Sequence, residues 1–187
     1  MKKFILLYLG LAFCAGALAQ TGVAIAKPRR PFPAIEHVIV ISVDGLRPDK
    51  ALQADMPALR GMLKAGAYTF WAHTTAMANT LPSHTSMLTG VIPPKHAIFW
   101  NEDLPLSTPY YPKVPTLFEM ASKAGYSTAM VAGKSKFATL NKPGTITYVW
   151  VPTGTNAKDN NDEVLAQAVS VIEAHQPEVM FIHFPDC

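Results

Sequence analysis

The sequence predicts an α/β fold in which a mostly parallel sheet is flanked by helices. Residues 37–43 form a continuous apolar, β-branched run, which is typical of a parallel strand buried on both faces. From this run onward, segments with strand patterns alternate with segments of helical periodicity. The chain has 187 residues, of which 49% are hydrophobic and 16% charged, so it suits one globular domain rather than a disordered segment.

The first 19 residues have the pattern of a secretory signal peptide. Two lysines precede a short apolar segment at 4–13, and residues 17–19 have the small-x-small pattern of a cleavage site. The apolar segment is too short to span a membrane, so we expect no membrane span after cleavage. We therefore expect a secreted protein, located in the periplasm of a bacterium-like cell. Cys187 would be the one cysteine left, which excludes an internal disulfide.

Residues 20–36 contain Pro28, Pro31 and Pro33 and are predicted to be an exposed linker. The domain itself is then expected over 37–187. Without the two leader lysines, the sequence has 14 basic and 13 acidic residues, a net charge near +1. Since this balance predicts no broad basic surface, a nucleic acid duplex is not expected as a partner.

Hydrophobic periodicity and helix-ending residues place the other elements. Residues 104–115 are rich in proline and are expected to be irregular. Helices are predicted over 56–66, 80–90, 116–125 and 162–175, and further strands over 67–75, 126–132, 147–151 and 178–184.

Two aspartates follow predicted strands at the edge where α/β proteins bind ligands. Asp44 comes directly after the first strand, and Asp186 comes after the last one. A carboxylate at the end of a buried strand is costly unless it meets a cation or a hydrogen-bond donor. Asp44 can alternatively cap the next turn through Gly45. Together, the two carboxylates can hold zinc, manganese or magnesium.

A threonine stands at the start of the helix predicted over 80–90. Pro82 suits the first turn, and Gly90 suits the end. Thr80 would then lie at the positive end of the helix dipole, where an alkoxide or a phosphate is favoured. A metal beside it would lower the pKa of the hydroxyl and make it a nucleophile. The alternative interpretation is an ordinary helix that begins with a proline.

Five segments taken together resemble the alkaline phosphatase superfamily, in particular the N-terminal part of its nucleotide pyrophosphatase/phosphodiesterase (type I phosphodiesterase) family. These segments are 43–49, 80–84, 88–90, 96–101 and 184–186, and their order and approximate spacing agree from His37 to Asp186. The resemblance implies that a threonine attacks phosphorus and forms a phospho-threonine, which water then hydrolyses. It also implies two zinc ions about 4 Å apart.

The resemblance assigns a role to each matching residue. Thr80 would be the nucleophile and also a zinc ligand, with Asp44 as a ligand of the same zinc. Asp186 would be the first ligand of the other zinc. Asn101 would donate a hydrogen bond to a phosphate oxygen, although from its own surroundings it can equally be a turn residue. Lys134, with Lys136 nearby, is expected either to contact a phosphate or to be a solvated surface residue.

The histidines do not fit the family's ligand pattern. His84 is expected to pack or cap within its helix, and period-two alternation puts His183 on the opposite face of its strand from Asp186. The histidines that the family places after its Pro-Asp pair do not occur, because the sequence ends at Cys187. We therefore expect a domain that is incomplete at its C-terminus and, as this chain, inactive.

Three hypotheses on function follow. The first is a metal-dependent hydrolase of phosphate diesters or pyrophosphates, whose small phosphorylated substrate can be a nucleotide. The second is a hydrolase of monoesters, phosphonates or sulfate esters from the same superfamily. The third is a non-catalytic fragment that binds metal weakly.

Overall fold

A four-stranded parallel sheet forms the centre of the protein. The structure is a computed structural model that describes residues 35–103, 109–153 and 160–187; the predicted signal peptide and most of the predicted linker lie outside these ranges. The strands are β1 (Val38–Val43), β2 (Thr128–Ala132), β3 (Tyr148–Trp150) and β4 (Val179–Phe184), and their order across the sheet is β1-β4-β2-β3. All three neighbouring pairs are parallel, which confirms the predicted fold class.

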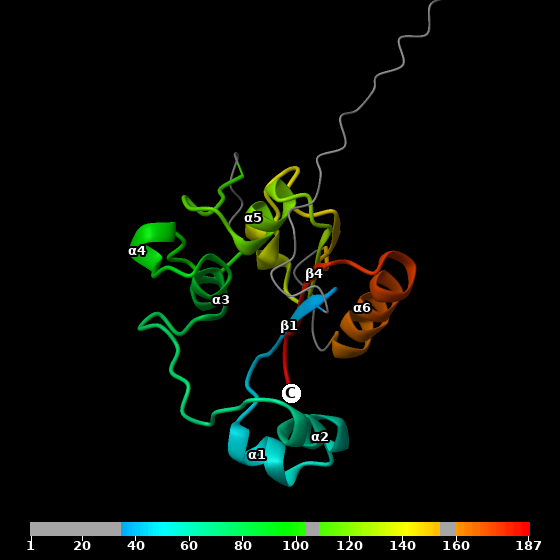
Figure 1. The fold of residues 1–187 in the computed structure, drawn as a ribbon. Helices are drawn as coiled ribbons and strands as arrows, with labels where there is room; N and C mark the ends of the chain where they lie inside the picture. The colour runs from blue at the N-terminus through cyan, green and yellow to red at the C-terminus, as the bar shows by residue number, and fades with distance from the viewer. Residues whose placement is uncertain (1–34, 104–108, 154–159) are drawn as a thin grey trace, which may run out of the picture.

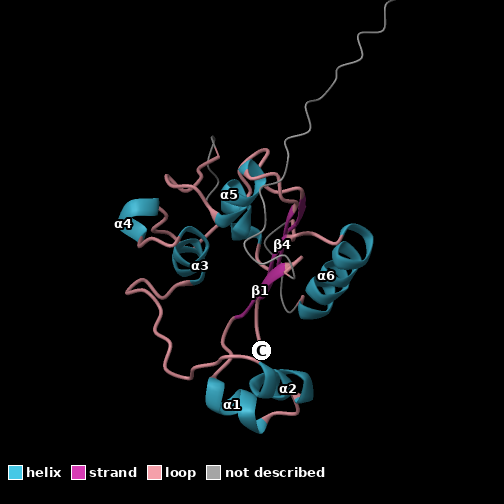
Figure 2. Ribbon diagram, in the orientation of Figure 1, coloured by secondary structure: helices cyan, strands magenta, loops and turns pink. Residues whose placement is uncertain are grey.

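Helices cover both faces of this sheet (Figures 1 and 2). α6 (Asn161–His175) packs on one face through Val164 and Ala168. The opposite face packs against α3 (Thr80–Thr89), α5 (Leu117–Lys123) and the 3-10 helix η1 (Ser135–Leu140). Each strand serves both layers, because successive side chains alternate between the faces.

The last strand shows this alternation clearly. Phe181 of β4 is fully buried and belongs to the core beneath α3 and α5. Met180 and Ile182 point the other way and pack in the core beneath α6. Residue 183 therefore lies on the same face as Phe181, the face that α3 covers.

The helix ends follow the residues that the sequence singled out. The side chain of Thr116 accepts a hydrogen bond from the backbone N–H of Glu119 and caps α5. Gly90 ends α3 with a left-handed φ of 70°, which a residue without a Cβ adopts at no steric cost.

The remaining helices are α1 (Pro48–Gln53), α2 (Pro57–Ala65) and the short α4 (Pro93–His96). No helix in the described ranges has the length and apolar character needed to cross a membrane.

Two strand predictions are wrong. Residues 67–75 form no strand, because no neighbouring strand pairs with them, and Tyr68 and Trp71 are exposed instead. The first strand is parallel, as predicted, but it is not buried on both faces. β1 pairs only with β4 among the described strands, and its side chains Ile39 and Ile41 are exposed because α6 packs on β2 and β4 rather than on β1.

The core beneath α5 predicts a stability difference between two residues of that helix. Phe118 is fully buried, whereas Met120 is 55% exposed. We expect Phe118→Ala to lower the free energy of unfolding by about 3–5 kcal/mol, because it removes buried surface and leaves a cavity. Met120→Ala is the matched control and should change it by less than about 0.5 kcal/mol. Urea unfolding followed by circular dichroism measures both values, and equal small losses would contradict this packing.

Candidate active site

The site is built around Asp44, the first residue after β1. Its backbone N–H donates to the carbonyl of Phe184 at 3.0 Å, so the ladder with β4 continues to this residue. In β1, Val40 packs in the core beneath α3 and Ser42 contacts a side chain of α3. Side chains two residues apart in a strand share one face, so Asp44 lies on the face of Val40 and Ser42. Its carboxylate is therefore directed toward the N-terminal part of α3.

Thr80 is the first residue of α3 and meets this carboxylate directly. Its hydroxyl donates to Oδ2 of Asp44 at 3.1 Å. The next backbone N–H, that of Leu81, donates to Oδ1 of Asn101 at 3.0 Å. The side-chain oxygen of Asn101 therefore accepts from one of the N–H groups that have no partner within the helix at its start. The contact also fixes the Asn101 side chain beside Thr80.

His84 lies one helical turn after Thr80 and is buried against the same carboxylate. Its Nδ1 lies 2.7 Å from the carbonyl oxygen of Thr80, and a carbonyl only accepts, so Nδ1 carries the hydrogen. Its Nε2 is then the acceptor for the hydroxyl of Ser42 at 2.7 Å. Nε2 also lies 3.8 Å from Oδ1 of Asp44. Burial lowers the pKa of His84 despite the opposing effect of the Thr80 carbonyl, which favours the neutral ring.

His183 reaches the site from β4. It stands beside Ser42 in the strand register and is fully buried. Its Nε2 lies 3.3 Å from Oδ2 of Asp44. The direction of approach is not that of a hydrogen bond, and neither ring nitrogen has a hydrogen-bond partner among the described residues. A buried imidazole in this state is costly unless something else binds it.

Asp44, His84 and His183 together fit a metal ion. One ligand atom from each residue lies within 4.8 Å of the others. Imidazole nitrogens with a carboxylate oxygen form a donor set that suits zinc and other divalent transition metals. The nitrogens of His183 are the observation that favours such an ion, because they are buried and make no hydrogen bond to a described residue, and Nε2 has only its 3.3 Å approach to Asp44.

Two lysines after β2 border the site. Nζ of Lys134 lies 2.5 Å from Oδ2 of Asp44, and Lys136 donates to the backbone carbonyl of Asn101. Burial raises the pKa of the Asp44 carboxyl, but His183 and Lys134 lower it by more. The pKa consequently lies well below its usual range, and the carboxylate is ionised.

The structure brings some of the predicted site residues together and leaves one apart. Thr80 and Asp44 are in contact, and Asn101 is bonded to the residue that follows Thr80. Asp186 is exposed, and its Oδ1 accepts from the backbone N–H of Cys187 at 2.9 Å. It lies close to Gly45, since a Cβ built on that glycine would be 3.8 Å from Oδ1 of Asp186. It does not belong to the group formed with His84.

Sequence reasoning missed His84, His183 and Lys134 as neighbours of Asp44. The i, i+4 spacing from Thr80 was a usable signal for His84, because such residues share one helix face. Period-two alternation along the last strand correctly predicted that His183 and Asp186 lie on opposite faces. It could not predict that His183 lies beside Asp44, because that contact depends on β1 and β4 being neighbours in the sheet.

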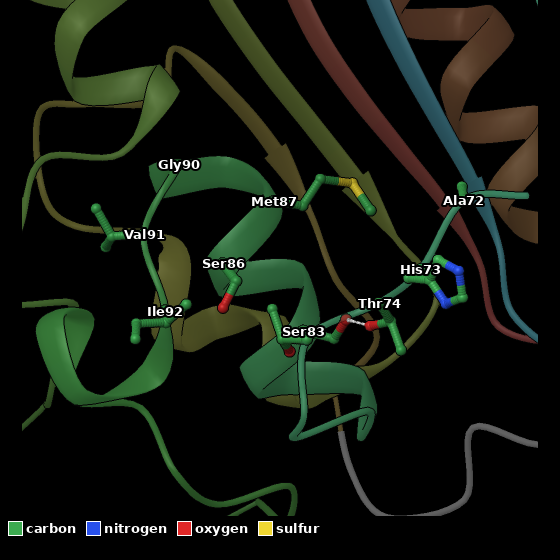
Figure 3. A pocket seen from close by; sticks show the side chains of 10 residues that line it. Ala72, His73, Thr74, Ser83, Ser86, Met87, Gly90, Val91 and Ile92 are labelled. Atoms are coloured by element: carbon green, nitrogen blue, oxygen red, sulfur yellow. Dashed lines mark hydrogen bonds between the residues drawn. The ribbon is translucent and has the colours of Figure 1, made fainter.

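A separate hollow of about 570 Å³ lies beside α3 and is lined by residues of two segments. Figure 3 shows Thr74 facing Ser83 of the helix, and His73 and Met87 also line the hollow. The hydroxyls of Thr74 and Ser83 are 2.6 Å apart and hold the two segments together. None of the residues that gather around Asp44 lines this hollow.

Solved structures share this architecture. The fold is similar to phosphonoacetate hydrolase from Sinorhizobium meliloti 1021 in complex with phosphonoformate, with a TM-score of 0.66, 22% identity, and coverage of 87% of this chain and 49% of that one. It is also similar to murine ectonucleotide pyrophosphatase/phosphodiesterase 5, studied as an inactive threonine-to-alanine variant with AMP. There the TM-score is 0.61 at 18% identity, with 80% of this chain and 43% of that one covered. The chain thus spans about half the length of these neighbours.

The sequence itself carries a family signature over most of its length. No curated protein matches it. The profile described as type I phosphodiesterase / nucleotide pyrophosphatase matches residues 38–182, a range that includes Asp44, Thr80 and Asn101. The chain therefore belongs to the type I phosphodiesterase/nucleotide pyrophosphatase family.

Proposed function

We propose that this chain carries the nucleophile half of a metal-dependent hydrolase of phosphate diesters or pyrophosphates, with Thr80 as the nucleophile. The observation that carries the proposal is the contact of the Thr80 hydroxyl with Oδ2 of Asp44 at 3.1 Å, at the start of α3. The murine neighbour is inactive when it carries a threonine-to-alanine substitution, which is the behaviour expected of a nucleophilic threonine.

The surroundings of Thr80 suit attack on phosphorus. The helix start favours the negative charge that develops on the attacking and non-bridging oxygens. Asn101 is fixed beside Thr80 and is the proposed donor to a phosphate oxygen. Asp44 orients the hydroxyl through its hydrogen bond. Thr80 would form a phospho-threonine, which water then hydrolyses.

We propose zinc as the metal, held by Asp44 with His84 and His183. A divalent ion at this place supplies Lewis-acid chemistry, because it lowers the pKa of a neighbouring hydroxyl and offsets charge on phosphate oxygens. We still propose Asp186 as the first ligand of a second zinc ion, which would bind next to Gly45. AMP, phosphonoformate and phosphonoacetate in the neighbours are small anions, which supports a small phosphorylated substrate.

The nucleophile is tested by substitution. In a family-length protein that contains this chain, we expect Thr80→Ala to lower hydrolysis of bis-p-nitrophenyl phosphate by at least about a thousandfold, because no other group is proposed to form the phospho-enzyme. Thr89→Ala in the same helix is the matched control. Among the residues that the structure describes, its hydroxyl bonds the carbonyl of Thr85 alone, at 2.6 Å, so activity should persist. Release of p-nitrophenol measures both. Turnover by the Thr80→Ala protein at the unsubstituted rate would refute the assignment.

The metal site is tested through heat stability. Adding Zn²⁺ to chelator-treated protein should raise the Tm, since an ion that binds only the folded state stabilises it. We expect His183→Phe to weaken Zn²⁺ binding by about tenfold or more, because even the loss of an outer-shell partner costs that much. The Tm of the metal-free protein should fall only slightly, since the ring keeps its packing and Asp44 keeps its contacts with Lys134 and Thr80.

His96→Phe is the matched control for that measurement. His96 is equally buried, but its Nε2 bonds the hydroxyl of Ser86 at 2.9 Å and its Nδ1 accepts from the N–H of Ile98 at 3.1 Å. This variant should therefore lose stability and keep its response to Zn²⁺. An unchanged Zn²⁺ response in His183→Phe would exclude His183 as a ligand.

The two lysines favour phosphonate hydrolysis as a second candidate function. Lys134 and Lys136 place two positive charges beside the group around Asp44, which suits a small substrate with two anionic groups. The phosphonoacetate hydrolase neighbour was solved with molecules of that kind, phosphonoformate and phosphonoacetate.

The two candidate functions predict different products. If the second is correct, phosphonoacetate should release inorganic phosphate faster than bis-p-nitrophenyl phosphate releases p-nitrophenol at equal concentration. Substituting both lysines with methionine should then slow the phosphonate reaction more than the diester reaction, because only the former has a second anionic group to bind. A phosphate assay with phosphonoacetate and a p-nitrophenol assay with the diester decide between them, and no phosphate from phosphonoacetate would reject the second candidate.

A further inference from the structure

Lys134 binds the Asp44 oxygen that lies nearest to His183, which is the oxygen an ion held between these two residues would use. Oδ2 of Asp44 is already approached by three groups: Nζ of Lys134 at 2.5 Å, the hydroxyl of Thr80 at 3.1 Å and Nε2 of His183 at 3.3 Å. One carboxylate oxygen offers about two lone-pair positions. While Lys134 is in place, this oxygen has none to spare for an ion.

Contacts of the neighbouring residue fix the backbone position of Lys134. The preceding residue, Gly133, donates its N–H to the carbonyl of His183 and accepts a hydrogen bond from Nδ2 of Asn160, both at 3.0 Å. A Cβ on Gly133 would come within 2.5 Å of Cδ of Pro185, so only glycine allows this approach. The backbone that carries Lys134 is thus held between β4 and the start of α6.

An ammonium group and a metal ion exclude each other at one carboxylate oxygen. Protonated Nζ has three donors and no lone pair, so it cannot serve as a ligand. A divalent ion between Asp44 and His183 would also be repelled by the charge of Lys134 at this distance. Without an ion, however, Lys134 compensates the half-buried charge of Asp44, which would otherwise be costly.

We propose that Lys134 is a resident counter-ion of Asp44 that competes with the metal and has to leave Oδ2 before an ion is bound. This inference rests on the metal site of the proposed function and adds a control on its occupancy. The metal-free protein keeps a paired, ordered Asp44, and the affinity for the ion is lowered by the free energy of the Lys134–Asp44 contact.

The test is the affinity of the metal-free protein for Zn²⁺, measured by isothermal titration calorimetry after removal of bound metal with a chelator. We expect Lys134→Met to bind Zn²⁺ about tenfold or more tightly than the unsubstituted protein, because a charge-assisted contact no longer has to be broken. Lys136→Met is the matched control. It removes the same charge two residues away, but its amine contacts the carbonyl of Asn101 and not Asp44, so affinity should stay within about threefold.

A double-mutant cycle in the metal-free protein assigns the Lys134 contact to Asp44. Lys134→Met should lower the Tm of the metal-free protein, and this loss should disappear in an Asp44→Asn background, because the ion pair is then already gone. Lys134→Gln is the second variant if Lys134→Met does not fold, as judged by circular dichroism. Several results would overturn the inference: equal or weaker Zn²⁺ binding by the Lys134 variants, the same gain in Lys136→Met, a loss of Tm that persists with Asp44→Asn, or no Zn²⁺ binding by the unsubstituted protein and both Lys134 variants.

Affinity and turnover separate this inference from the proposed function. Tighter Zn²⁺ binding by Lys134→Met with no hydrolysis of any phosphate ester by the family-length protein would reject the function and leave the inference standing. Hydrolysis by the family-length protein with no gain in affinity would reject the inference alone.

Discussion

The half-buried carboxylate of Asp44 is the constraint on which the site depends. It stands at the end of β1, where the peptide ladder stops and the side chain is directed at the start of a helix. A charge in that place needs compensation, and the surrounding chain supplies it from three directions. Thr80 comes from α3, His183 from β4 and Lys134 from the turn after β2. The site therefore exists only when these elements are assembled.

Two simple periodicities deliver the side chains to that point. Alternation along β1 and β4 puts Ser42 and His183 side by side on the face that α3 covers. The helical repeat puts His84 one turn after Thr80, so both residues face the same carboxylate. The rings of His84 and His183 meet edge to face, with centroids 5.0 Å apart. Packing against Phe137 then fixes both rings, which makes the site a continuation of the hydrophobic core.

The sequence predicts local features of this fold well and non-local ones poorly. Hydrophobic periodicity and capping residues placed α3, α5, α6 and the four observed strands to within a few residues, because these signals act over neighbouring positions. They also marked Asp44 and Thr80, whose positions at a strand end and a helix start are local facts. Strand order is not local. Without it, His183 could not be assigned to the group around Asp44, the exposed edge of β1 was unforeseen, and the aromatic segment 67–75 was mistaken for a strand.

The lowered pKa of Asp44 limits what the Thr80–Asp44 hydrogen bond can do. A carboxylate that His183 and Lys134 hold in its charged form is a weak proton acceptor, so it orients the hydroxyl without removing its proton. If Thr80 is the nucleophile that we propose, its activation would have to come from positive charge at the hydroxyl oxygen rather than from Asp44 acting as a base. Lys134 places its positive charge at Oδ2 of Asp44 and not at the hydroxyl oxygen. The proposed reactivity of Thr80 would therefore depend on which cation Asp44 holds.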